Sequence, residues 1–89
     1  MRIENLEYDG LLAPIQTTQL NNNWEVITEL ANYFDEKGED HKLFNVFLYN
    51  AEVGHVEESS KHAAKNEADE AHKNLVKKAP QLIKKFNNK

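Results

Sequence analysis

Three observations predict that this chain is an all-α protein, a small three-helix bundle with an extended N-terminal arm. Apolar residues recur at the three- and four-residue steps of an amphipathic helix over residues 24–34 and again over residues 64–86. Asn23 and Asp40, which are favourable helix N-caps, come just before apolar stretches. Gly38 follows the first stretch, at the place of a left-handed helix C-cap.

The chain is expected to form one domain, with residues 1–22 as an N-terminal arm or hairpin and residues 23–89 as the helical part. A chain of this size buries only about 60–65% of its unfolded surface, so its core should be thin. The sequence contains no cysteine. That absence excludes disulfide bonds, thiolate catalysis and cysteine-based zinc sites.

Residues 1–22 have the weakest helical pattern. Asp9-Gly10 is a turn signal with apolar residues on both sides. Pro14 is incompatible with an ordinary helix interior, and the threonine pair that follows it favours extended backbone. The sequence therefore predicts an extended arm or a small hairpin that packs across the helices.

The first two helices are predicted at residues 23–37 and 40–53. The stripe of the first contains Trp24, Ile27, Leu30, Ala31 and Phe34. The second is apolar nearly all round, which is typical of a central helix or of a surface that faces a partner. A buried β-strand is the competing interpretation of this second segment, because phenylalanine, valine and tyrosine are strand-prone.

The third helix is predicted at residues 57–87, with a kink at Pro80 because proline interrupts the helical hydrogen bonds. Its stripe contains Ala64, Ala68, Ala71, Leu75, Leu82, Ile83 and Phe86. The alternative fold is α+β. In that fold residues 2–19 form an N-terminal hairpin and residues 42–50 form a third strand.

Charge is distributed unevenly along the chain. The last 17 residues contain six lysines and no acid, whereas the first 72 contain five basic residues and all 15 acids, within a net charge of −4. The lysines singled out are Lys73, Lys77, Lys78, Lys84 and Lys85. They are expected to complement the C-terminal end of the helix dipole and the acidic body. Binding of nucleic acid or another acidic surface through this lysine-rich tail is the alternative.

The motifs of catalysis and cofactor binding are missing from the sequence. It has no Gly-x-Ser-x-Gly element and no glycine-rich phosphate loop, so we expect neither an enzyme nor a cofactor. On a continuous helix five potential metal ligands would share roughly one face: His55, Glu58, His62, Asp69 and His72. A weak histidine-based metal-binding domain is therefore a further alternative, although a solvated polar stripe is the simpler interpretation and no residue is assigned as a ligand.

These observations favour a small cytoplasmic protein that acts by binding another protein. Proteins of this kind include the regulators, inhibitors and immunity proteins that bacteria, phages and mobile elements encode. The residues expected to contact a partner are Tyr33, Phe47, Tyr49 and Val53, surrounded by an acidic rim. A homodimer is the other assembly considered. Nucleic acid is disfavoured by the negative net charge, and neither a signal peptide nor a membrane-inserted segment is expected.

Overall fold

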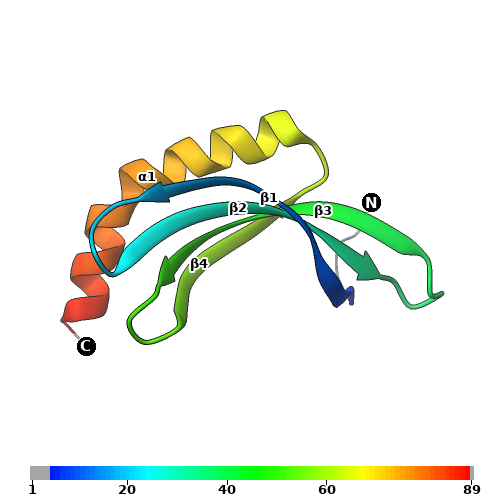
Figure 1. Cartoon of the computed structure of the whole chain (residues 1–89), viewed down its shortest axis with the longest axis horizontal. Coiled ribbons are helices and arrows are strands. Elements are labelled where there is room, and N and C mark those ends of the chain that lie inside the picture. The colour runs from blue at the N-terminus through cyan, green and yellow to red at the C-terminus, as the bar shows by residue number, and fades with distance from the viewer. Residues whose placement is uncertain (1–4, 89) are drawn as a thin grey trace.

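The computed structural model describes residues 5–88 and consists of a four-stranded antiparallel sheet with one C-terminal helix (Figure 1). In chain order the elements are β1 (Glu7–Gln19), β2 (Trp24–Phe34), β3 (Asp40–Asn50), β4 (His55–His62) and α1 (Lys65–Asn87). Strands that follow one another in the sequence are neighbours in the sheet, in the order β1-β2-β3-β4. The sheet is thus a meander whose edge strands are β1 and β4.

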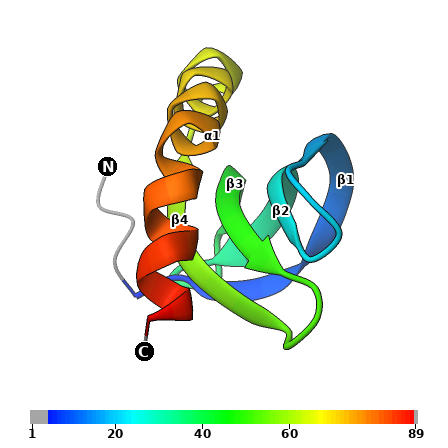
Figure 2. The same ribbon diagram turned by 90° about the vertical axis from the view of Figure 1, so that its left-hand side faces the viewer.

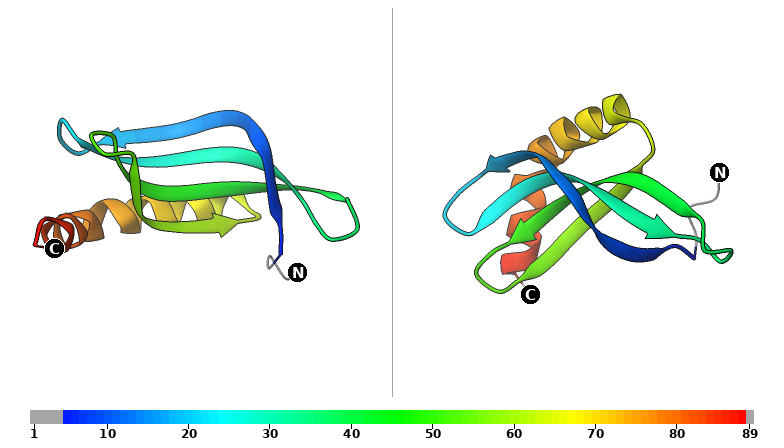
Figure 3. Two further views of the ribbon diagram at one scale, coloured as in Figure 1. Left: turned by 90° about the horizontal axis from the view of Figure 1, so that it is seen from below. Right: turned by 45° about the vertical axis from the view of Figure 1, so that its right-hand side comes forward.

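Helix α1 packs on one face of the sheet, against β2, β3 and β4. It lies over β3 with β2 and β4 on either side, and Figure 2 shows β1 as the strand farthest from it. The two views in Figure 3 show the helix running along the strands while the strands arch and twist beneath it. One sheet face is therefore covered by α1, and the opposite face is not.

The three-helix bundle predicted from the sequence is wrong. Residues 23–37 form β2 and a turn, residues 40–53 form β3 and the next turn, and residues 57–87 divide into most of β4 and α1. Aromatic and β-branched residues, which are favoured in strands, are frequent from Trp24 to Tyr49, and here that preference agrees with the tertiary structure.

The helical spacing in β2 arises because its buried residues change from one sheet face to the other along the strand. Val26 and Thr28 face α1, whereas Ala31 and Tyr33 lie in a second small cluster with Leu43. A strand with apolar residues on both faces loses the strict alternation that distinguishes a strand from a helix. The remaining apolar positions then match three- and four-residue steps by coincidence.

The predicted N-terminal hairpin is also absent from the described residues. From Glu7 to Gln19 the chain is one long strand that pairs with β2. Gly10 lies at one of three register shifts in this pairing, so the predicted turn at Asp9-Gly10 is an irregularity within β1. Residues 1–4, which include the start of the expected hairpin, lie outside the described part of the chain.

The two glycines expected to end helices instead form hairpin turns. Gly38, between β2 and β3, has φ of 80°, and Gly54, between β3 and β4, has φ of 69°. Left-handed backbone is needed both at a helix C-cap and in a tight hairpin, and glycine adopts it without strain. The local conformation was therefore predictable, although the elements on either side were not.

The main core lies between α1 and the sheet. It contains Trp24, Val26, Val46, Leu48, Ala68, Leu75 and Ala79. The small residues Ala68 and Ala79 are fully buried, which lets α1 approach the strands closely. Pro80 lies inside α1, and Figure 1 shows the helix axis turning toward its red C-terminal end. Among residues 5–88 no helix combines the length and apolar character needed to cross a membrane.

His72 is the buried polar residue that ties α1 to the sheet. Its Nδ1 lies 2.7 Å from the hydroxyl of Thr28 on β2, and its Nε2 lies 2.8 Å from the hydroxyl of Thr18 on β1. Burial lowers the pKa of His72 below its usual value of 6.5, while the carboxylate of Asp69 acts weakly in the opposite direction. The folded protein therefore favours the neutral ring.

We predict that this histidine makes the fold sensitive to acid. Because the pKa of His72 is lower in the folded state, the unfolded chain binds the proton first as the pH falls below about 6.5. Stability should be fully present above that pH and should decrease below it. Urea denaturation between pH 8 and pH 5, compared with His72→Gln, measures this. An equally steep decrease in the variant would contradict the prediction.

Candidate interaction surface

The sheet face turned away from α1 is a candidate site, and we call it the open face. Side chains alternate along a strand, so neighbours of the core residues point away from the helix. The register places nine such residues together on three strands: Glu25, Ile27 and Glu29 on β2, Asn45, Phe47 and Tyr49 on β3, and Val56, Ser59 and Lys61 on β4. Two of the residues predicted to bind a partner, Phe47 and Tyr49, are in this set.

The centre of the open face is apolar. Phe47 lies opposite Ile27, and Val56 lies opposite Tyr49. The rings of Phe47 and Tyr49 meet edge to face with centroids 6.4 Å apart. Val56 remains 46% exposed, whereas the two aromatic residues are half-buried. A depression of about 240 Å³ adjoins Phe47 and Val56.

Charged residues surround this apolar centre. Glu25 is paired in register with Tyr49, and Glu29 with Asn45. Lys61 lies at the β4 edge, with its Nζ 5.7 Å from the ring centroid of Tyr33. The face therefore combines aromatic contact area with two carboxylates and one ammonium group, a composition suited to a protein partner.

Tyr33, which the sequence suggested as a contact residue, is only 4% exposed. Its hydroxyl donates a hydrogen bond of 2.8 Å to Oδ1 of the buried Asn45. Burial raises the pKa of Tyr33, although the hydrogen bond to Asn45 acts in the opposite direction. By register Tyr33 lies on the same side of the sheet as Phe47, but the ring of Tyr8 packs against it with centroids 5.6 Å apart, and its side chain is buried.

Val53 lies in the turn between β3 and β4 and is 61% exposed. Asn50 supports this turn, because its Oδ1 accepts the backbone N–H groups of Glu52 and Val53. A Cβ atom at Gly54 would lie 4.0 Å from the hydroxyl of Tyr49. Val53 also lines a depression with Trp24 and Phe86, so it lies beside the C-terminal part of α1 and is not grouped with Phe47.

The lysines of the tail project from α1, which covers the other face of the sheet. Lys73, Lys77, Lys84 and Lys85 are exposed, and the last two lie in the final helical turn, where positive charge complements the helix dipole. Lys78 forms an ion pair of 3.3 Å with Glu58 on β4. The sheet thus separates these lysines from the aromatic residues of the open face.

The histidines and acids considered as a metal site do not converge. His55 contacts Glu57 at 2.7 Å, His62 contacts Ser60, and His72 is enclosed by two threonine hydroxyls. The shared face assumed for them required one continuous helix. His55 and His62 lie on β4, whereas Asp69 and His72 lie on α1.

A different acidic cluster occurs in the turn between β2 and β3. Ligand atoms of Asp35, Glu39 and His41 lie within 4.8 Å of one another. Asp35 is already engaged, because Oδ1 accepts the backbone N–H groups of Lys37 and Glu39 and Oδ2 lies 2.8 Å from His41 Nε2. These hydrogen bonds lower the pKa of Asp35, and the hydrogen bond with His41 has the largest effect. Asp35 therefore stabilises the turn between β2 and β3. The sequence pattern did not indicate this cluster.

Comparison of the chain with protein-family models, with curated proteins and with solved structures gave no match. The functional argument therefore depends on the surfaces of this molecule. Of these, the open face is the one that brings together the most aromatic and apolar residues outside the core.

We predict that the two tyrosines near the open face differ sharply in their contribution to stability. Tyr33→Phe should destabilise the protein by about 1–3 kcal/mol, because it leaves the buried oxygen of Asn45 without its donor. Tyr49→Phe is the matched control and should change stability by less than about 0.5 kcal/mol, as is usual for a surface change. Urea denaturation measures both, and equal effects would contradict the assignment of Tyr33 to the interior.

Proposed function

We propose that this chain is a small, non-enzymatic, cytoplasmic interaction module that binds another protein through the open face. The observation that supports the proposal is the grouping of Phe47, Tyr49 and Val56 on a sheet face that no element between residues 5 and 88 covers at that point. Aromatic residues with a polar border are characteristic of protein interfaces. A regulator, an inhibitor or an immunity protein would work in this way, by occupying a surface of its target.

The partner that fits this face has an apolar contact centre with basic residues at its border. Glu25 and Glu29 lie on the same face as the aromatic residues, and the first 72 residues contain all 15 acids of the chain. Opposite charge on the partner would accelerate association and make it sensitive to salt. The apolar centre would then supply most of the affinity, as buried aromatic residues usually do.

The first test is capture of partners from a lysate of the source cell with the tagged chain. The variant Tyr49→Ser/Val56→Ser removes two apolar contacts of the open face. We expect the wild-type chain to retain a partner protein after nuclease treatment. The variant should retain at least about tenfold less of this partner, because truncation of interface hot spots costs about 2 kcal/mol or more. Quantitative mass spectrometry of the retained proteins measures the change.

Two control variants make the outcome specific. Leu12→Ser removes an apolar side chain that is 49% exposed on β1, and it should leave capture unchanged. Lys84→Gln/Lys85→Gln removes two charges from the tail. If capture survived the open-face variant but was lost with the lysine variant, the tail would be the binding site and the proposal would be wrong.

A further inference from the structure

The two edges of the sheet differ in how well they can accept another strand. The pairing of β1 with β2 contains three register shifts, and Pro14 removes a backbone N–H from β1. The pairing of β4 with β3 has one shift, beside Val56, and is regular from Glu58 to His62. Strand order gives β4 no second neighbour within residues 5–88. An extended segment therefore finds a regular, unpaired edge on β4.

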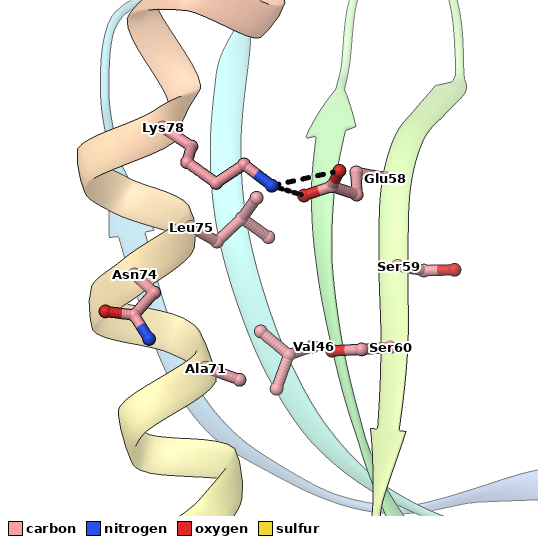
Figure 4. A pocket seen from close by; sticks show the side chains of 8 residues that line it. All are labelled: Val46, Glu58, Ser59, Ser60, Ala71, Asn74, Leu75 and Lys78. Carbon is pink, nitrogen blue, oxygen red and sulfur yellow. Dashed lines mark hydrogen bonds and ion pairs between the residues drawn. The ribbon is translucent and has the colours of Figure 1, made fainter.

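A depression of about 340 Å³ adjoins this edge, between β4 and α1 (Figure 4). Val46 and Leu75 form its apolar floor, and the small side chains of Ala71 and Ser60 leave it open. An engineered cavity of about 150 Å³ can hold benzene, so this depression has room for an aliphatic side chain. The ion pair between Lys78 and Glu58 spans one end, as the dashed lines in Figure 4 show.

We propose that β4 and α1 together form a second binding site, which takes an extended peptide segment as a fifth strand. The peptide backbone would hydrogen-bond to the free edge of β4, and one of its side chains would enter the depression beneath α1. Strand addition beside a helix uses backbone hydrogen bonds for affinity and the adjoining pocket for specificity. This site shares Lys61 with the open face and does not depend on the function proposed for that face.

The geometry also defines the chemistry of the peptide. Side chains of an added strand alternate between the two sheet faces. The peptide residue beside Ser60 faces α1, and an aliphatic side chain there would meet Ala71 and Leu75, with the fully buried Val46 beneath them. The adjacent residue lies beside Lys61 on the open face, where a carboxylate would form a favourable cross-strand pair. The expected ligand thus contains neighbouring acidic and aliphatic residues within an extended segment.

The test begins with selection from a displayed library of random ten-residue peptides against the whole chain. We expect enriched peptides to contain an acidic residue next to leucine, isoleucine or valine. Affinity is then measured by fluorescence anisotropy with synthetic peptides that are N-methylated at alternate positions. Methylation of the peptide N–H groups that point toward β4 should abolish binding, and methylation of the N–H groups that point away from β4 should not. Absence of enriched peptides, or equal binding by both methylated forms, would overturn the proposal.

Variants of the protein locate the peptide. Ala71→Leu fills the depression and should weaken binding at least about tenfold, a change of about 1.4 kcal/mol. The same substitution at the exposed Ala63 is the matched control and should have no effect. Circular dichroism checks that both variants fold. Peptide binding should persist in the variant Tyr49→Ser/Val56→Ser. If this variant lost peptide binding while Ala71→Leu kept it, the peptide would lie on the open face and the inference would be wrong.

Discussion

Burial of one sheet face beneath α1 is the interaction on which the rest of this structure depends. A four-stranded meander with both faces exposed would have little core, and here Val26, Val46 and Leu48 reach full burial only against the helix. The alanines Ala68 and Ala79 allow that contact, because larger side chains would hold the helix away from the strands. Each pairing within the sheet is therefore reinforced by packing from one side.

The placement of α1 also decides which surfaces remain for binding. Because the helix covers β2, β3 and β4 from one side, its lysines face away from the sheet and Phe47 and Tyr49 stay uncovered by α1 on the reverse. His72 joins the helix to β1 and β2 through two threonine hydroxyls. One helix thus organises the core, the open face and the depression beside β4.

The site was partly predictable because residue chemistry is visible in a sequence, whereas orientation is not. Phe47 and Tyr49 stood out as aromatic residues in an unusually apolar segment, and the pleat of β3 puts both on the open face. Tyr33 has the same chemistry, yet its hydroxyl is bound to Asn45 in the interior. Val56 and Lys61 were missed because they join the face only when β4 pairs with β3.

By itself the sequence determined local features: left-handed backbone at Gly38 and Gly54, a helix over the alanine and lysine stretch, and the uneven distribution of charge. Tertiary structure decided that residues 24–34 and 40–50 are strands. The buried residues of β2 and β3 change from one sheet face to the other along each strand, so neither the two-residue nor the 3.6-residue period dominates. Pairing with the neighbouring strands of the meander then selects the extended conformation, which the aromatic and β-branched residues favour but the spacing of the apolar residues does not reveal.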